Sequence, residues 1–357
     1  MALTHLPPRG LRDPSQKGFV LVSRSLRSSV FRIAAPAAKR ADAAAHCVKV
    51  TRGSEKAILR QFDVLKRLSR CEDGCSGALA VPRPLPDLVS FGMGHAESGK
   101  GTAFLWIATP WVRGMSLDRH MATAACEKRE SLLVDALELA LALAEAINGL
   151  SLMTERGRKL VHGDIKPSNI IVSTGGTKRI SLVDFDTLFF QGDEGAPPCG
   201  TYGYSAPEIV AAEEEGWACG GDSADVYSFG VVAHEMLTGA WPYPFPAGLI
   251  AGRSHWISWF RRSSIIRIEE RLPPDVHALL LACLARDPCS RPRCDEVVAI
   301  LKRMANRYRD SSILCSRRTC EPAPPTPASS AESAACLEPW IDPEVLRNSL
   351  RASLRIL

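Results

Sequence analysis

The sequence changes its pattern near residues 108 to 114, where the stretch ATPWVRG separates two parts of different character. Residues 18 to 108 are strand-like, apart from the segment SEKAILRQFDVLKRL, in which Ile58, Phe62 and Leu65 fall at helical spacing. From residue 131 onward the pattern is helical, as in SLLVDALELALALAEAINGL and DVYSFGVVAHEMLTG. A β-rich front and an α-rich rear predict an α+β fold of two lobes, and cofactor sites tend to lie in the cleft between lobes.

The composition limits the class of protein. The chain has 357 residues, 46% of them hydrophobic, so it is long enough to bury one large core or two lobes. Its net charge is +5, without a long block of like charge, so we expect no nucleic-acid partner. Glu138 and Glu145 interrupt the apolar run LELALALAEAI, which therefore predicts a buried helix and no transmembrane segment.

The 12 cysteines indicate a reducing, cytoplasmic compartment, because their spacing is irregular and no secretory segment precedes them. The pairs Cys71/Cys75 and Cys289/Cys294 lack both the CxxC spacing and the nearby histidine pair expected of a zinc site. We interpret them as small buried apolar residues.

The N-terminus allows two interpretations. Residues 1 to 40 hold eight Lys or Arg and a single acid, Asp13, which is the composition of a transit peptide. However, GFVLV and SVFRI within this region alternate like two strands joined by a turn. We therefore expect a short extension over residues 1 to 17, followed by folded sequence.

After residue 308 the composition changes again. We expect a disordered linker over residues 309 to 341, of which the stretch EPAPPTPASSAESAA is rich in Pro, Ala and Ser. Residues 342 to 357 then predict an amphipathic basic helix that starts with Asp342 and Pro343 and carries leucines on one stripe and arginines beside it. This helix would either dock on the rear lobe or bind a partner or a membrane surface.

Two neighbouring segments carry the residues on which a function can be argued. VHGDIKPSNIIV places Asp164, Lys166 and Asn169 on one loop, and LVDFDT follows with Asp184. This order and spacing resemble the eukaryotic-like Ser/Thr protein kinase family, and the resemblance extends over residues 18 to 308. It implies a bilobal protein kinase-like fold, with a small β-rich N-lobe to about residue 109 and a larger α-helical C-lobe from about residue 110.

The resemblance implies a role for each polar residue in transferring the γ-phosphate of ATP to a protein hydroxyl. Asp164 would accept the proton of the attacking hydroxyl, and Lys166 would lie against the transferring phosphate. Asn169 and Asp184 would hold Mg²⁺. Such a reaction needs positioning and charge neutralisation rather than covalent help from the protein. Asp186 replaces the family's D-F-G glycine and could either obstruct the backbone flip of this segment or add a second carboxylate near the metal.

Three further matches extend the resemblance through the rear half. GTYGYSAPE resembles the end of an activation segment, where Thr201 would contact the catalytic aspartate and lysine. Asp225 in DVYSFG would hold the backbone of the catalytic loop, and Arg291 in RDPCSRP would pair with Glu208.

The front half matches less well. CVKV fits the A-x-K pattern, so that Lys49 would reach the α- and β-phosphates and Cys47 would lie above adenine. The stretch SRSLRSSV overlays the family's glycine-rich loop with a serine at every glycine position, which gives the nucleotide-binding candidates Ser23, Ser25, Ser28 and Val30. Serine keeps the backbone N–H groups but adds a Cβ, so we expect weaker nucleotide affinity.

Three other features of the nucleotide site follow from the same alignment. Gln61 stands where the family has the helix glutamate that pairs with the lysine, and it could hydrogen-bond Lys49 without neutralising it. Glu55, about 9 Å away along the helix axis, is a possible substitute. The hinge candidates are Thr109 as gatekeeper, Pro110 and Val112, and the resemblance adds Ile171 to the nucleotide-binding residues.

Two alternative functions remain open from the sequence. H-G-D combined with D-F-D also resembles aminoglycoside and choline phosphotransferases, whereas Lys166 and the GTYGYSAPE segment favour a protein kinase. The serine loop and Gln61 would suit a non-catalytic pseudokinase scaffold. Gly163 stands where many kinases have an arginine before the catalytic aspartate, so we expect activity without phosphorylation of the activation segment.

Overall fold

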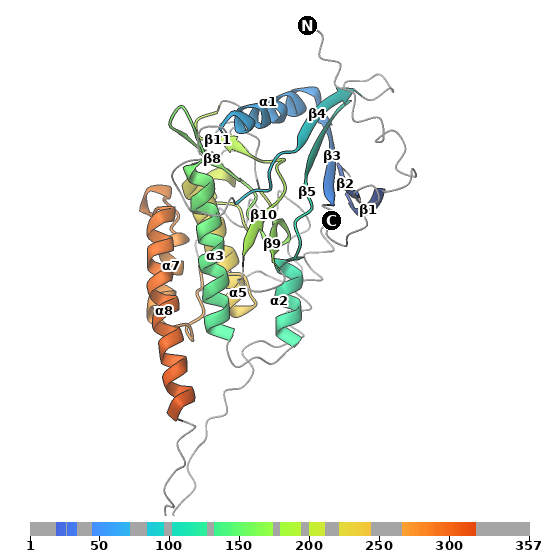
Figure 1. Ribbon diagram of the computed structural model, residues 1–357. Helices are drawn as coiled ribbons and strands as arrows, with labels where there is room; N and C mark the ends of the chain where they lie inside the picture. Colours follow the sequence, from blue (N-terminus) through green and yellow to red (C-terminus); the bar gives the residue numbers. More distant parts are fainter. Residues whose placement is uncertain are drawn as a thin grey trace, which may run out of the picture.

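The computed structural model describes residues 19–25, 27–33, 45–71, 84–95, 102–126, 132–173, 179–193, 200–210, 221–243 and 266–318. These residues form a sheet-rich N-lobe and a helical C-lobe, which lie one above the other in Figure 1. The predicted α+β bilobal fold is therefore confirmed.

The N-lobe is one antiparallel five-stranded sheet with a helix against it. In spatial order its strands are β1 (Phe19–Arg24), β2 (Ser28–Ile33), β3 (His46–Ser54), β5 (Thr102–Pro110) and β4 (Ser90–His95). Helix α1 (Glu55–Cys71) starts directly after β3 and packs against β3, β4 and β5. This order places β3, which carries Lys49, at the centre of the sheet.

Alternation of side chains explains how the N-lobe core forms. Strand β5 buries Ala103, Leu105 and Ile107, which share one face because successive side chains of a strand point to opposite sides. Ile58 and Leu65 of α1, which the sequence pattern placed on one helical face, are also buried. The amphipathic helix predicted in this region is therefore confirmed.

Strand β1 differs from its expected pattern. GFVLV does form a strand paired with β2, but Val20, Leu21 and Val22 are exposed by 61, 52 and 49%, so the strand shows no alternation of burial. The pairing register shifts between Leu21 and Ser23, which accounts for part of this irregularity.

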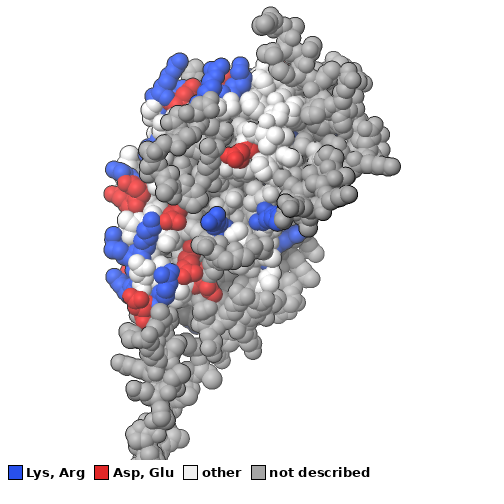
Figure 2. All heavy atoms as spheres, viewed as in Figure 1, with Lys and Arg blue, Asp and Glu red and all other residues white. Residues whose placement is uncertain are grey.

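The C-lobe is built around two buried helices. Helix α3 (Leu132–Leu152) packs against α5 (Asp222–Thr238) and α8 (Cys294–Arg318), α7 (Pro274–Cys283) packs against α5 and α8, and α2 (Leu117–Cys126) lies near the hinge. Glu138 and Glu145 lie on the partly exposed side of α3, where they pair with Arg309 and Lys302 of α8 at 2.8 and 2.9 Å. Along the α7 and α8 edge, Figure 2 shows basic and acidic side chains interspersed.

Two small sheets position the catalytic segments at the top of the C-lobe. One consists of β10 (Ile180–Leu182), β9 (Ile170–Val172) and β6 (Met115–Ser116), and the other of β11 (Phe189–Phe190), β8 (Arg158–Val161) and β7 (Thr154–Glu155). The HGDIKPSN loop therefore connects β8 to β9, and the DFD segment connects β10 to β11.

The last described helix changes one predicted boundary. Helix α8 continues to Arg318, past residue 308 and into the predicted linker. The N-terminal extension over residues 1 to 17, the Pro-rich part of the linker and the basic helix over residues 342 to 357 lie outside the described residues. Among the described helices, none has the length and apolar composition needed to cross a membrane.

Candidate active site

The catalytic loop is held from below by a buried carboxylate. Asp225, near the start of α5, accepts hydrogen bonds from the backbone N–H of His162 at 2.8 Å and of Gly163 at 3.0 Å. Gly163 has φ +78°, a conformation that glycine adopts without strain. The predicted contact of Asp225 with the loop backbone is confirmed, and it fixes the backbone immediately before Asp164.

Asp164, Lys166 and Thr201 form a closed triangle of polar contacts. The Lys166 ammonium lies 2.8 Å from Asp164 Oδ2 and donates to Thr201 Oγ1 at 2.6 Å. The Thr201 hydroxyl in turn donates to Asp164 Oδ1 at 2.7 Å. The activation-segment threonine therefore meets the loop aspartate and lysine, as the sequence predicted.

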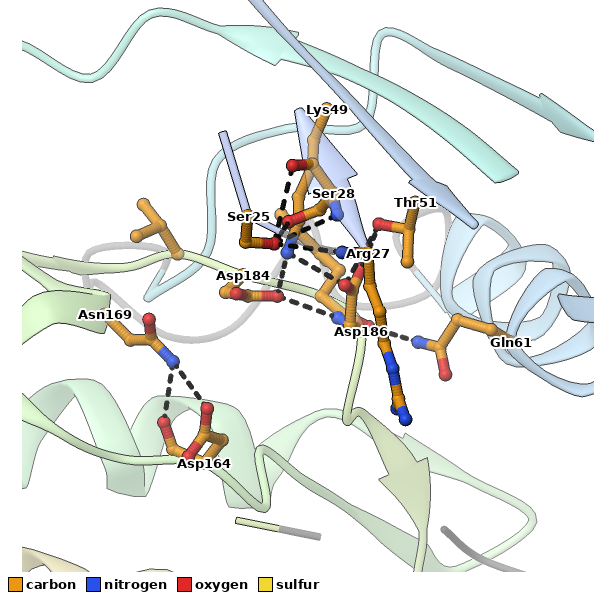
Figure 3. A network of polar contacts seen from close by, with 12 residues as sticks. Ser25, Arg27, Ser28, Lys49, Thr51, Gln61, Asp164, Asn169, Asp184 and Asp186 are labelled. Carbon is orange, nitrogen blue, oxygen red and sulfur yellow. Dashed lines mark hydrogen bonds and ion pairs between the residues drawn. The ribbon is translucent and has the colours of Figure 1, made fainter. Parts of the chain in front are cut away.

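Asn169 completes the loop from the other side. Its side-chain nitrogen Nδ2 donates to the backbone oxygen of Asp164 at 2.9 Å and to Asp164 Oδ2 at 3.0 Å, as Figure 3 shows. Because both contacts use the nitrogen, the carbonyl oxygen Oδ1 is the atom of this side chain able to bind a cation.

His162 connects the catalytic loop to the DFD segment. This fully buried side chain shares a hydrogen bond of 3.2 Å between Nε2 and the carbonyl of Val183, while Nδ1 accepts from the N–H of Asp164 at 3.3 Å. A carbonyl can only accept, so the proton belongs on Nε2. The imidazole thus sets the distance between the loop that bears Asp164 and the residue before Asp184.

The DFD segment lies beneath β3 and meets Lys49. The ammonium of Lys49 is 2.5 Å from Asp184 Oδ1 and 2.9 Å from Asp186 Oδ2 (Figure 3). Asp184 has φ +78°, which is unusual for a residue with a Cβ, and its Oδ1 accepts the backbone N–H of Asp186 at 3.2 Å. Strand β3 of the N-lobe and the DFD segment of the C-lobe are thus joined by charge.

The pKa values of Lys49, Asp184 and Asp186 are shifted in different directions. Burial lowers the pKa of Lys49, but the carboxylates of Asp184 and Asp186 outweigh it and hold that pKa above its ordinary value. Burial opposes ionisation of Asp184, yet its contact with Lys49 keeps its pKa below the usual range. Burial and the neighbouring Asp184 carboxylate raise the pKa of Asp186. Asp184 is therefore the more readily ionised of the two carboxyl groups.

Gln61 lies on the predicted helix but has a different hydrogen-bond partner from the one expected. It is buried and donates its side-chain N–H to the backbone carbonyl of Phe185, not to Lys49. Glu55 is exposed at the first turn of α1, and among the described residues the carboxylates paired with Lys49 are those of Asp184 and Asp186. From the sequence, Asp186 was expected to obstruct the backbone flip or to add a carboxylate near the metal, and its contact with Lys49 was missed because nothing in the sequence places it beside β3.

The serine loop is the turn of the β1–β2 hairpin. Ser25 Oγ accepts the backbone N–H of Arg27 at 3.3 Å and of Ser28 at 3.0 Å, and it shares a contact of 3.0 Å with Ser28 Oγ. The resemblance to a glycine-rich loop implied that these N–H groups face phosphates. In the structure the Ser25 hydroxyl satisfies two of them, while Ser23 pairs with Val30 across the hairpin.

The hinge candidates are distributed over the end of β5 and the strands beside it. Cys47 faces Thr109 across the β3–β5 ladder, and Pro110 faces His46. Burial raises the pKa of the Cys47 thiol, which therefore stays protonated. Val112 follows β5 and is partly buried, whereas Ile171 lies on β9 in the C-lobe, paired with Ser116 and Ser181.

A buried ion pair fixes the activation segment to the C-lobe. The Arg291 guanidinium, whose side chain is fully buried, contacts both carboxylate oxygens of Glu208 at 2.7 Å. It also donates to the backbone oxygens of Ala285 and Ser223 at 2.8 and 2.9 Å. The predicted pairing of Arg291 with Glu208 is confirmed.

A second charge cluster, which the sequence analysis missed, joins α1 to the C-lobe. Arg67 contacts both oxygens of Asp193 at 3.0 and 2.5 Å and Glu155 at 3.2 Å, and Arg158 reaches Asp193 at 2.9 Å. The guanidinium of Arg67 also lies over the ring of Phe190. We call Arg67, Glu155, Arg158 and Asp193 the α1 clamp. No local sequence signal marks it, because its members are brought together only by the packing of the two lobes.

The described oxygen donors suit a nucleotide-bound divalent cation. Mg²⁺ is usually held by one or two carboxylates together with waters and phosphate oxygens, rather than by an all-protein cage. Asp184 and the Oδ1 atom of Asn169 provide such a partial set, and among the described residues no three His, Cys, Asp or Glu side chains form a complete cage. The residues present therefore fit a cation that arrives with ATP.

A two-lobed fold with a loop aspartate, lysine and asparagine beside a metal-type aspartate defines the class of kinases. The family model described as "Protein kinase domain" matches residues 96–300, which is more than half of the chain. The chain belongs to the protein kinase domain family. The match starts after β4, so most of the N-lobe, where the glycine-rich loop and the helix glutamate are replaced, lies outside it.

Distant relatives carry the same family name. The chain is 29% identical over 166 residues to the probable serine/threonine-protein kinase drkD of Dictyostelium discoideum, covering 46% of this chain and 12% of the relative. It is 28% identical over 209 residues to the serine/threonine-protein kinase PknJ of Mycobacterium bovis, covering 55% and 32%. It is 32% identical over 146 residues to an Aurora kinase of Yarrowia lipolytica, covering 40% and 35%. The chain thus spans about a third or less of the length of these relatives.

Proposed function

We propose that this chain is an ATP-dependent Ser/Thr protein kinase that transfers the γ-phosphate to hydroxyls of protein substrates. The observation that carries the proposal is the Asp164–Lys166–Thr201 triangle. It places a carboxylate beside an ammonium at the end of the activation segment, where a substrate hydroxyl would have to lie. It also distinguishes this site from the aminoglycoside and choline phosphotransferases, against which Lys166 and the activation segment already argue.

Each residue has a role that follows from its contacts. Asp164, held by Thr201 and Asn169, orients the attacking hydroxyl and accepts its proton. Lys166 offers positive charge to the transferring phosphoryl oxygens, and Lys49 does so for the phosphates closer to the nucleoside. Asp184 and Asn169 would hold Mg²⁺, which neutralises phosphate charge when bound. The protein's own contribution is orientation and electrostatic stabilisation in a site held together by fixed hydrogen bonds.

A direct assay separates this proposal from its alternatives. The unsubstituted chain and Asp184→Asn are incubated with MgATP and a Ser/Thr peptide library, beside an aminoglycoside and choline panel. We expect peptide phosphorylation by the unsubstituted chain and a loss of at least about 100-fold in the variant, because a removed metal ligand abolishes charge neutralisation. Labelling of the small molecules alone would favour the phosphotransferase alternative. Equal background rates in both proteins would favour a non-catalytic scaffold. The main structural argument for a scaffold is that the Ser25 hydroxyl already accepts the N–H groups of the serine loop.

We also propose that activity does not require phosphorylation of the activation segment. Gly163, with its left-handed backbone, stands before Asp164, so no arginine at this position needs a phosphate to neutralise it. Phosphatase treatment should leave the rate of peptide phosphorylation within about twofold of the untreated rate. A large loss, with the lost phosphate mapping to residues 187 to 201, would contradict this.

A further inference from the structure

Lys49 needs a carboxylate partner other than the one its family uses. Protein kinases place the lysine by an ion pair with a glutamate of the N-lobe helix, and both this pair and the metal-binding aspartate must be in place for activity. Here that helix position is Gln61, which binds the carbonyl of Phe185. The Lys49 side chain is only 14% exposed, and an ammonium this far removed from water requires a charged partner.

Asp186 meets this requirement from a different element. One of its carboxylate oxygens lies 2.9 Å from the Lys49 ammonium, and both oxygens accept from the Thr51 hydroxyl at 3.1 and 3.0 Å. Lys49 and Thr51 are two residues apart on β3, so their side chains leave the same face of the strand. Figure 3 shows both side chains directed at Asp186. The carboxylate is therefore bound by two donors from one strand, which fixes its orientation.

Asp184 alone does not replace this partner. Asp184 is also paired with Lys49, but it is the residue expected to bind the metal, so its charge is shared when nucleotide is present. Asp186 remains as the carboxylate that contacts Lys49 and Thr51 of β3. Thr51 contributes a hydroxyl that stabilises the Asp186 carboxylate without competing for Lys49.

We propose that Asp186 is the positioning residue for Lys49, in place of the helix glutamate of the family. It acts through Lys49 and is not itself a catalytic residue. Its effect on turnover rests on the proposed kinase function, but its effect on nucleotide binding does not. A consequence is that the lysine and the metal aspartate are positioned by the same short segment. The placement of Lys49 then does not depend on a helix glutamate, and the α1 position of that glutamate contributes the neutral Gln61 contact with Phe185.

A double-mutant cycle on nucleotide binding tests the proposal. The affinity for fluorescent ADP is measured with EDTA, for the full chain, Asp186→Asn, Lys49→Met and the double variant. Without Mg²⁺, any effect of Asp186 must reach the phosphates through Lys49 or by direct repulsion. Since repulsion makes loss of the carboxylate favourable, we expect Asp186→Asn to weaken binding by about three- to tenfold when Lys49 is present. In the Lys49→Met background it should leave binding unchanged or strengthen it.

Thr51→Val serves as the matched conservative variant. It removes only the hydroxyl that holds Asp186, so it should weaken binding less than Asp186→Asn, and again only when Lys49 is present. Thermal unfolding of each variant without nucleotide identifies any variant that has lost its fold. Asp186→Glu keeps the negative charge and serves as a second replacement if Asp186→Asn does not fold.

The outcomes separate this proposal from the kinase function. Three outcomes would overturn the positioning role of Asp186. They are equal weakening by Asp186→Asn in both backgrounds, weakening that occurs only with Mg²⁺, and no ADP binding by the unsubstituted chain. Weakening confined to Mg²⁺ would assign Asp186 to the metal instead. If the binding cycle behaves as expected but no phosphoryl transfer is detected, the kinase function fails and the positioning role stands. If transfer is detected and the cycle shows no coupling, only the positioning role fails.

Discussion

The hydroxyl oxygen of Ser25 accepts a hydrogen bond of 3.0 Å from the backbone N–H of Ser28, at the position where a glycine-rich loop would present that N–H to phosphate. Nucleotide binding must therefore break an existing hydrogen bond before a new one can form. We expect Ser25→Ala to bind MgADP more tightly, by roughly two- to tenfold, which corresponds to one hydrogen bond of about 0.5–1.5 kcal/mol. Titration of a fluorescent nucleotide measures this.

Ser29→Ala is the control for Ser25→Ala. Ser29 lies on β2 beside the turn and pairs with Val50 of β3, so its substitution removes a hydroxyl without freeing the loop N–H groups. Its nucleotide affinity should stay within about twofold of the unsubstituted chain. Weaker binding by Ser25→Ala would show that the hydroxyl supports the loop more than it blocks it.

The buried pair of Arg291 and Glu208 should dominate the stability of the C-lobe. Arg291→Ala leaves the Glu208 carboxylate, only 16% exposed, without its counter-charge. Loss of one partner of a buried pair typically costs about 3–5 kcal/mol. We expect a fall of this size in the apparent free energy of unfolding, measured with urea. Arg293→Ala is the control, because this side chain is 71% exposed and water screens its pair with Asp295, so its loss should change the free energy of unfolding far less.

Glu235 should make stability depend on pH. Burial raises its pKa to about 7 from an ordinary value of 4.5, although the Tyr204 hydroxyl, which donates to it at 2.7 Å, opposes that rise. Between these two pH values the folded chain keeps a proton that the unfolded chain has lost. Stability from this group is therefore fully present below about pH 4.5, falls as the pH rises, and is lost once the pH has passed about 7, above which it no longer changes.

Glu235→Gln isolates this term, because the amide keeps an acceptor oxygen and does not titrate. From about pH 5 to pH 8, the stability of the unsubstituted chain relative to this variant should fall by an amount on the order of 3 kcal/mol. Thermal unfolding across the pH range provides the comparison. Parallel stability curves for the two proteins would show that Glu235 ionises near its ordinary pKa.

The α1 clamp should determine how firmly α1 is held. Arg67→Ala removes the charged hydrogen bonds to Asp193 and Glu155, for which a loss of about 1.5–3 kcal/mol is expected. Amide hydrogen exchange over α1 should become faster and peptide phosphorylation slower. Arg70→Ala is the control, since Arg70 lies on the exposed face of the same helix. Equal exchange in both variants would exclude a specific role for the clamp.

The C-lobe could be predicted in detail because its function depends on short, ordered motifs. Asp164, Lys166 and Asn169 lie within six residues on one loop, so their mutual contacts follow from local geometry. The contacts of Thr201, Asp225 and Arg291 are long-range, yet each is marked by a motif whose position in the chain identifies it.

The N-lobe could be predicted only in outline, because its departures from the family compensate for one another across different elements. The sequence shows that Gln61 cannot neutralise Lys49. It does not show that Asp186 lies within reach of Lys49, because the two residues are 137 positions apart in the chain. Thr51 was overlooked, although a polar residue two positions after Lys49 must share its face of β3. The α1 clamp gave no such signal.

The hydrogen bond from Gln61 to the Phe185 carbonyl has a consequence for inhibitor design. A compound that needs the Phe185 ring displaced would have to break this bond, and the rearranged backbone would also draw Asp186 away from Thr51 and Lys49. The conformation that accepts such a compound would then be sparsely populated, and its apparent affinity would fall in proportion to that population. Compounds that bind beside Thr109 with the segment in place carry no such penalty, so this chain should favour them, and their association should be the faster of the two.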